Sequence, residues 1–236
     1  MSDRAAIVER ALGYPYRIPD RSFLQAGART LDLVPEPAQL NGRTAVLALG
    51  SNAAPQVLAG KLGLGEGDEP VPAIRAELRD FDVVYSAHIS AYGSLPAAIQ
   101  VSPGTGAAIH VLYLTDEQLA AMAETEPNYD AVVIEGVRCR LGTGADLDAA
   151  HCFLSKHGCL RVAGAPLALA AIRATGRRLR AASEPEALEL VRERLAPNLP
   201  LARFVAESVE DRAAREQRNR ALAADAVPFA GRHRAA

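Results

Sequence analysis

The sequence contains little cysteine, no excess of positive charge and no long hydrophobic run. No apolar stretch in the 236 residues approaches the about 20 residues of a membrane-spanning helix. The first residues, Met1 to Arg4, lack the basic start and apolar stretch of a signal peptide. The formal net charge of -2 gives the molecule no bulk attraction for nucleic acid or an anionic membrane. We therefore expect a cytoplasmic protein that binds neither.

Cysteine and lysine are both scarce in the sequence. The three cysteines, Cys139, Cys152 and Cys159, are an odd number, which argues against a disulfide framework and predicts free thiols. Lysine occurs only at positions 61 and 156 against many arginines, and alanine is abundant. This composition is typical of a high-GC bacterial genome and indicates no function.

The composition that remains is that of an ordinary globular protein with a substantial core. Hydrophobic residues make up 49% of the chain and charged residues 23%, and this balance excludes a disordered chain. The length suits one compact domain with additions at both ends better than two independent domains. We predict an N-terminal extension that packs on the outside of the core (residues 1–42), a core (43–163) and a C-terminal helical segment with a disordered tail of about ten residues (164–236).

Apolar periodicity and turn residues place strands first and helices last. The expected strands are residues 44–49, 73–90 as one strand or two, 97–101 and 107–114 joined by a hairpin-like connection at 102–106, 131–140, and 149–155. The expected helices are residues 3–12, 55–62, 116–125, 168–172, 186–195 and 201–224. This segregation predicts an α+β fold with a mixed or barrel-like sheet, flanking helices and a C-terminal helical segment.

The segment Leu49-Gly50-Ser51-Asn52 follows the first core strand and precedes Pro55, which suits the first turn of a helix. Glycine permits unusual backbone angles, and serine and asparagine can cap a helix, so several N–H groups can point into one concavity. Such a turn binds a carboxylate or phosphate. The tripeptide alone is also an ordinary turn, so its function depends on its context.

Glu126 supplies that context, because it ends an apolar helix about seventy-five residues later and is followed by Tyr129. With Pro96-Ala97-Ala98-Ile99 and the Pro103-Gly104 turn between them, these features resemble the gamma-glutamylcyclotransferase-like family from about Thr44 to Val137. The resemblance implies a core of that family's type. Leu49 departs from the family's pattern, because a tyrosine usually stands there and its hydroxyl is missing here.

The resemblance implies cyclisation of a gamma-glutamyl amide to 5-oxoproline with release of an amine. The substrate's own α-amino group attacks the γ-carbonyl, so the protein must fold the substrate and move protons. Glu126 would be the general acid/base, a role favoured if partial burial raises its pKa. Leu49, Gly50, Ser51, Asn52 and Tyr129 would bind this small carboxylate-bearing substrate, with backbone N–H groups of 50–52 on its carboxylate. We expect no cofactor and no metal.

Other interpretations of the sequence remain open. Tyr92-Gly93-Ser94-Leu95 matches the family's loop more literally, but a strand rather than a helix follows it, which favours a plain turn. A non-catalytic protein of the same fold could bind a small acid or a partner. We expect Glu124, beside Glu126, to be solvated.

Histidine and cysteine residues permit two further readings. A zinc site could be read from His151, Cys152, His157 and Cys159, with Cys139 upstream. These residues lack paired metal ligands at short spacing, such as Cys-x-x-Cys. A Cys152 nucleophile with a histidine base has no local motif in its support. His88 and His110 lie inside apolar strands, where we expect hydrogen-bonded core histidines.

Overall fold

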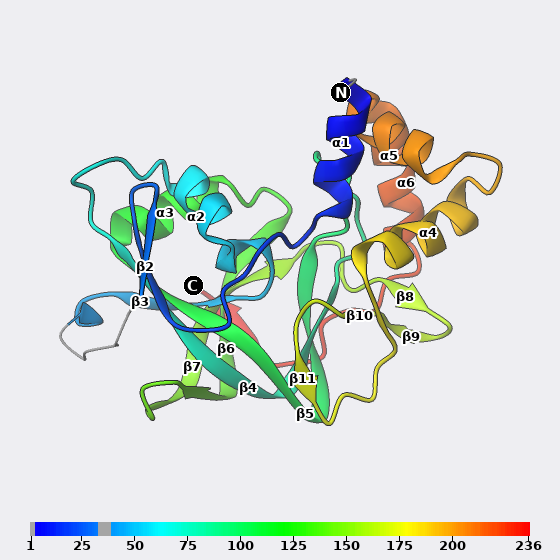
Figure 1. The fold of residues 1–236 in the computed structure, drawn as a ribbon. Coiled ribbons are helices and arrows are strands. Elements are labelled where there is room, and N and C mark those ends of the chain that lie inside the picture. The colour runs from blue at the N-terminus through cyan, green and yellow to red at the C-terminus, as the bar shows by residue number, and fades with distance from the viewer. Residues whose placement is uncertain (1–2, 33–38) are drawn as a thin grey trace.

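A five-stranded mixed barrel forms the centre of the protein (Figure 1). The computed structural model describes residues 3–32 and 39–236. The barrel strands are β3 (Thr44–Ala48), β4 (Val71–Tyr85), β5 (Ala97–Leu114), β6 (Tyr129–Leu141) and β7 (Asp146–Ser155). Their order is β3-β5-β4-β6-β7, and β7 returns to β3 as a parallel neighbour while the other pairs are antiparallel. The predicted α+β class with a barrel-like sheet is confirmed.

Six short strands extend the barrel at several edges: β1 (Phe23–Ala26), β2 (Arg29–Asp32), β10 (Ala168–Leu169), β11 (Ala174–Thr175), β12 (Ala181–Ala182) and β13 (His233–Ala235). Strands β8 (Arg161–Val162) and β9 (Ala165–Pro166) pair with each other as a separate two-stranded sheet. The pair β1 and β2 adds to β4, β10 pairs with β4 and β12, β11 pairs with β5, and β13 pairs with β6. Segments before and after the core therefore join the same sheet.

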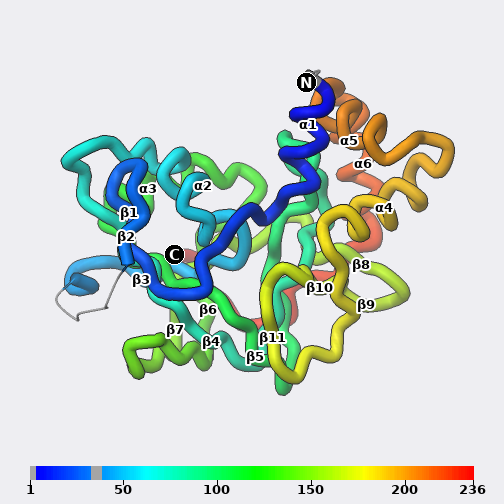
Figure 2. The backbone as a smooth tube through the Cα atoms, viewed as in Figure 1, coloured from blue at the N-terminus to red at the C-terminus, as the bar shows by residue number. Residues whose placement is uncertain are grey.

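The helices form two groups, which the tube in Figure 2 separates clearly. In the described ranges the six α-helices are α1 (Asp3–Leu12), α2 (Pro55–Leu62), α3 (Asp116–Glu124), α4 (Glu184–Leu195), α5 (Leu201–Glu210) and α6 (Arg212–Ala223). Helices α2 and α3 pack together over the barrel, whereas α1 packs on α5 beside α4 and α6. None of these six helices combines the length and apolarity needed to span a bilayer.

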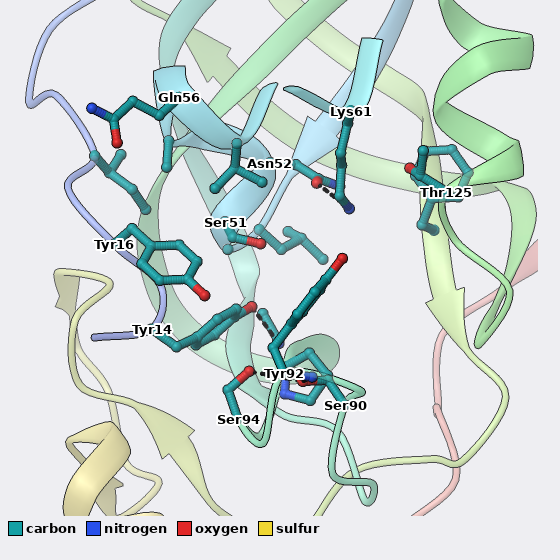
Figure 3. A pocket seen from close by; sticks show the side chains of 18 of the residues that line it. Tyr14, Tyr16, Ser51, Asn52, Gln56, Lys61, Ser90, Tyr92, Ser94 and Thr125 are labelled. Atoms are coloured by element: carbon teal, nitrogen blue, oxygen red, sulfur yellow. Dashed lines mark hydrogen bonds between the residues drawn. The ribbon is translucent and has the colours of Figure 1, made fainter. Parts of the chain in front are cut away.

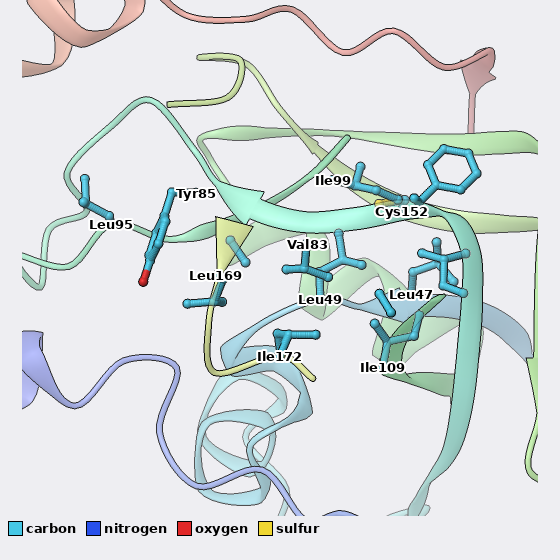
Figure 4. Close-up of a cluster of buried hydrophobic side chains, with 14 of the residues drawn as sticks. Leu47, Leu49, Val83, Tyr85, Leu95, Ile99, Ile109, Cys152, Leu169 and Ile172 are labelled. Atoms are coloured by element: carbon cyan, nitrogen blue, oxygen red, sulfur yellow. The ribbon is translucent and has the colours of Figure 1, made fainter. Parts of the chain in front are cut away.

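Apolar side chains from the barrel strands fill its interior (Figure 4). Leu47, Val83 and Ile109 are buried there, and Leu169 and Ile172 pack on them from the segment after the barrel. Since each fully buried aliphatic side chain contributes about 1.5–3 kcal/mol, this core holds the strands in place. The polar cavity described below opens at the end of the barrel where β3 and β7 finish and β6 begins.

Several predicted elements are confirmed. Strand β3 and helix α2 lie where the sequence placed them, and Pro55 occupies the first turn of α2. Thr115 caps the predicted helix α3, and Gln118 completes a reciprocal pair of hydrogen bonds with it. Helix α1 matches the prediction for residues 3–12. Residues that start or cap a helix act locally, and they were reliable guides here.

The predicted hairpin at residues 102–106 is wrong. Strand β5 continues through it against β4, and the register shifts between Arg79 and Phe81. Asp80 and Gly104 take positive φ values of 63° and 83° at this irregularity. The proline and glycines mark a bulge, which bends a strand without reversing it.

The predicted helix at 168–172 is also wrong, because Ala168 and Leu169 form the fully buried strand β10 between β4 and β12. Sheet pairing and burial outweigh the helix propensity of this alanine-rich run. The helix predicted for 201–224 is two helices, since Asp211 interrupts it and accepts hydrogen bonds from Ala213 N and Ala214 N at the start of α6. The tail expected to be disordered carries β13.

Part of the expected N-terminal extension lies outside the described residues, namely 1–2 and 33–38. The proline-fixed stretch after α1 was expected on the outside of the core. Tyr14 in this stretch is instead buried, and residues 14–21 form one wall of the cavity.

Candidate functional site

A cavity of about 1200 Å³ lies at one end of the barrel, and its walls come from distant parts of the chain (Figure 3). The turn after β3 and helix α2 form one side, and residues 125–129, after α3, form another. Residues 14–21 and the loop 90–97 complete the lining. Segments distant in sequence thus meet around one space large enough for a small-molecule ligand.

Leu49 and Gly50 lead from β3 into a single 3-10 turn, η2 (Ser51–Ala53). A Cβ atom at position 50 would overlap the hydroxyl of Tyr14 and the side chain of Ala97. Glycine is therefore required here because its close neighbours leave no room for a side chain.

Glu126 is held just beyond the end of α3. Its backbone N–H donates to Ala123 O at 3.1 Å, and its carbonyl accepts from Tyr129 N at 3.0 Å, so the backbone turns tightly on both sides. Only 8% of Glu126 is exposed, although the residue lines the cavity. Glu124, two residues earlier, is exposed as expected.

Glu126, Asn52 and Lys61 form a closed triangle of hydrogen bonds. Asn52 Nδ2 donates to Glu126 Oε1 at 2.9 Å, Lys61 Nζ donates to the same oxygen at 2.5 Å, and Lys61 Nζ donates to Asn52 Oδ1 at 2.8 Å. Only one orientation of the Asn52 amide satisfies both partners. The ion pair is largely withdrawn from solvent, since 21% of the Lys61 side chain and 9% of the Glu126 side chain are exposed.

The triangle engages only one oxygen of the carboxylate. Both hydrogen bonds end on Glu126 Oε1, and no described residue donates to Oε2. Oε2 is not buried, and because Glu126 lines the cavity, this oxygen is open to the space there. A carboxylate fixed through one oxygen and open through the other is suited to exchange a proton with a ligand.

The structure brings all the predicted site residues to this cavity: Leu49, Gly50, Ser51, Asn52, Glu126 and Tyr129. Their individual contacts differ from expectation. The Asn52 side chain binds Glu126, and the backbone N–H of Ser51 faces the hydroxyl oxygen of Tyr14. Tyr129 donates its hydroxyl proton to Ala97 O at 2.9 Å and presents its ring to the cavity.

Sequence reasoning missed Tyr14 and Lys61 as site residues. Tyr14 is 8% exposed, and its oxygen accepts a hydrogen bond from Ala97 N at 2.7 Å. Burial is the main cause of the raised pKa of the Tyr14 hydroxyl, so this hydroxyl stays protonated. The scarcity of lysine was a signal that could have drawn attention to Lys61, whereas nothing local marked Tyr14.

The sequence favours a plain turn, and not the substrate loop, at Tyr92-Gly93-Ser94. In the structure this turn lines the same cavity from another side. Figure 3 shows Tyr92 and Ser94 facing the turn that carries Ser51 and Asn52. Tyr92 is 51% exposed, and the guanidinium of Arg10 lies 4.0 Å from the centre of its ring. This pair lies on the lining without touching the triangle.

Arginine side chains give the cavity wall positive charge. Arg17 and Arg173 lie on the lining, and no described carboxylate forms an ion pair with either of them. Asp20 and Glu126 are the acidic residues on the same lining. The excess of positive charge favours an anionic ligand.

The three cysteines are buried, and His88, His110, His151 and His157 are buried or half-buried, whereas His233 is exposed. Burial raises the pKa of the Cys152 thiol to about 12, which leaves it a weak nucleophile at neutral pH. His110 contacts Arg21 O at 3.0 Å, and His88 contacts Ser86 Oγ at 2.7 Å, as expected for core histidines. Burial lowers the pKa of His88 to about 3, so this cavity-lining ring is neutral. Within the described ranges, no three His, Cys, Asp or Glu side chains gather as a metal site.

Comparison of the chain with protein-family models, with curated proteins and with solved structures gives no match. The class of protein is therefore defined by its own architecture. It is an α+β protein with a five-stranded mixed barrel and a polar cavity at one end of that barrel.

Proposed function

We propose that the protein is a gamma-glutamylcyclotransferase-like enzyme that cyclises a gamma-glutamyl amide to 5-oxoproline and releases an amine. The observation that carries this proposal is that Glu126 projects into the same cavity as the turn at residues 49–52. The chain order of strand, turn, helix and acid supports it as well.

The reaction needs one group that accepts and returns a proton. The substrate's α-amino nitrogen attacks the γ-carbonyl carbon, a new C–N bond closes the five-membered ring, and the original amide C–N bond breaks. Glu126 Oε2 takes the proton from the attacking nitrogen and delivers it to the leaving nitrogen. Asn52 and Lys61 hold Oε1, so the carboxylate keeps its direction during both transfers.

The cavity lining provides partners for the rest of the substrate. Arg17 and Arg173 offer positive charge to a carboxylate, and the turn at residues 50–52 forms the nearest backbone wall. The ring of Tyr129 and the side chain of Leu49 supply apolar surface. Folding the substrate so that its amine meets its own carbonyl contributes the proximity that such a reaction requires.

Product formation tests the proposal directly. The wild-type protein is incubated with a panel of gamma-glutamyl amino acids, simple gamma-glutamyl amides and glutathione, and 5-oxoproline is measured. We expect product from at least one of them, and Glu126→Gln to reduce kcat by about 10²–10⁴-fold because the proton acceptor is lost. Glu124→Gln, which changes an exposed neighbour, is the matched control and should retain full turnover.

Two outcomes would contradict the proposal. A folded wild-type protein that forms no 5-oxoproline from the whole panel contradicts the reaction. Turnover of Glu126→Gln at the wild-type rate contradicts the role of Glu126.

The ion pair between Lys61 and Glu126 favours a second candidate, a non-catalytic protein of the same fold that binds a small acid. A paired carboxylate can serve to hold a pocket in shape without reacting. This candidate predicts that gamma-glutamyl ligands raise the melting temperature without being consumed.

A further inference from the structure

The hydroxyls of Tyr14 and Tyr129 both bind the backbone of Ala97, but in opposite directions. The Ala97 carbonyl accepts the proton of Tyr129, whereas the Ala97 N–H donates to the oxygen of Tyr14. The N–H of Ser51 faces the same Tyr14 oxygen. The Tyr14 oxygen thus accepts from backbone N–H groups, whereas the Tyr129 hydroxyl already donates its proton to a backbone carbonyl.

The proton of the Tyr14 hydroxyl has no acceptor among the described residues, because in its hydrogen bond with Ala97 the Tyr14 oxygen is the acceptor. The side chain lines the cavity, and in Figure 3 its hydroxyl end points toward the middle of that space, near Ser51. A buried phenol whose oxygen receives amide protons is a polarised donor for a ligand. A ligand oxygen in the cavity would complete its hydrogen bonding.

We propose that Tyr14 donates this hydrogen bond to the substrate carbonyl oxygen that becomes negatively charged during cyclisation. The proposal rests on the proposed function and adds a substrate-contacting residue to it. The ligand oxygen must lie near both Tyr14 and Glu126, and both of these side chains line the same cavity. A substrate carboxylate is better served by the charged Arg17 and Arg173, so the neutral phenol is assigned to the carbonyl.

This assignment also accounts for two features of the turn. Gly50 lacks a side chain where the Tyr14 hydroxyl approaches, so the turn is shaped to admit this residue. Leu49 presents no hydroxyl at the cavity, and Tyr14 brings one to the same turn from the N-terminal segment. The hydroxyl is thus supplied from outside the barrel.

Tyr14→Phe tests the proposal, because it removes the hydroxyl and keeps the ring. We expect kcat for 5-oxoproline formation to fall about 10- to 100-fold, with KM changed less than threefold, since the bond strengthens as charge develops. Tyr85→Phe is the matched control: it removes another buried hydroxyl, which donates to Ala182 O at 3.0 Å and lies off the cavity. This control should keep the wild-type kcat.

A second measurement separates donation from a structural role and also serves if Tyr14→Phe does not fold. Fluorinated tyrosines placed at position 14 keep the ring and hydroxyl but make the phenol progressively more acidic. Donation to a developing negative charge predicts that kcat depends on this acidity, whereas support of the loop does not.

Three results would overturn the proposal. The first is a wild-type kcat in Tyr14→Phe, whether or not KM rises. The second is a kcat independent of phenol acidity in the fluorinated series. Either of these would leave the proposed function standing if the wild-type protein forms 5-oxoproline. The third is a wild-type protein with no turnover, which overturns the proposed function and this inference together.

Discussion

Two buried glutamates, in different regions of the protein, have opposite surroundings. Glu126, at the end of the barrel, is 8% exposed and has Asn52 and Lys61 on one oxygen and the cavity before the other. Glu184, at the start of α4, is 2% exposed, and within residues 3–32 and 39–236 its single donor is Leu95 N, at 2.7 Å. Its Oε2 is buried without a partner among the described residues.

The difference shows how partners decide what a buried acid can do. Burial holds the pKa of Glu184 well above its usual value, although the Leu95 N–H opposes this shift. Its place at a helix N-terminus, worth about 0.3–1 kcal/mol to a negative charge, does not offset that burial. Glu184 is therefore a neutral structural residue, whereas Glu126 has a cation beside it and one carboxylate oxygen open to the cavity.

Removing Lys61 should have the largest effect on this difference between the two glutamates, because it takes away the cation beside Glu126. Lys61→Met keeps most of the side-chain volume but leaves Glu126 buried with Asn52 as its remaining partner. We expect unfolding by denaturant to show a loss of about 2–3 kcal/mol, because the carboxylate loses its charge partner. We also expect kcat to fall at least about tenfold as the carboxylate loses its fixed direction.

The chain's other lysine provides the matched control. Lys156 is exposed and lies 3.7 Å from Asp130, so Lys156→Met should cost less than about 1 kcal/mol. Equal stability losses in the two variants would show that the buried pair has no special contribution.

Glu184→Gln tests the second glutamate, which the folded protein is expected to keep protonated. The folded protein keeps a proton on Glu184 that the unfolded chain releases above its usual pKa of 4.5, so wild-type stability declines as pH rises from there. Glutamine has no proton to release. The variant should match the wild type near pH 4 and become more stable toward pH 8, with the difference growing by at most about 1.4 kcal/mol per pH unit.

Thermal unfolding across this pH range checks the prediction. Glu124→Gln removes an exposed carboxylate and should give a difference that does not grow with pH. A difference for Glu184→Gln that stays flat from pH 4 to pH 8 would mean that the folded protein does not retain the proton.

The smallest effect is expected at the thiol near Glu126. Cys152→Ala should keep turnover within about twofold of the wild type and cost roughly 1–2 kcal/mol, because it removes one buried atom from the core. Cys139→Ala, at another buried cysteine that does not line the cavity, is the comparison. A tenfold loss of activity confined to Cys152→Ala would instead favour the thiol route.

The parts of the fold that depend on local chemistry were predictable from the sequence. Strand β3, the start of α2 at Pro55 and the capping of α3 by Thr115 follow from short-range preferences. Strand β10 was mistaken for a helix because its pairing with β4 joins segments about eighty residues apart. Such long-range pairing leaves no pattern in the alanine-rich run itself.

The same division applies to the site. Glu126 and Asn52 could be proposed from the elements around them, and the structure joins them by a hydrogen bond. Lys61 and Tyr14 could not, because their roles arise from packing: α2 against α3, and residues 14–21 across the end of the barrel. A side chain that reaches a site from a distant segment has no local motif to reveal it.

The position of Tyr14 also has a consequence for synthesis of the chain. Tyr14 directly follows α1, and α1 packs on α5 through contacts that include paired hydrogen bonds from Arg4 to Glu210, both at 2.8 Å. The segment that walls the cavity is synthesised before the barrel strands, whereas its docking partner α5 is synthesised after them. The barrel can therefore pair its strands before α5 exists, but the N-terminal wall can dock through α1 only once α5 has been made.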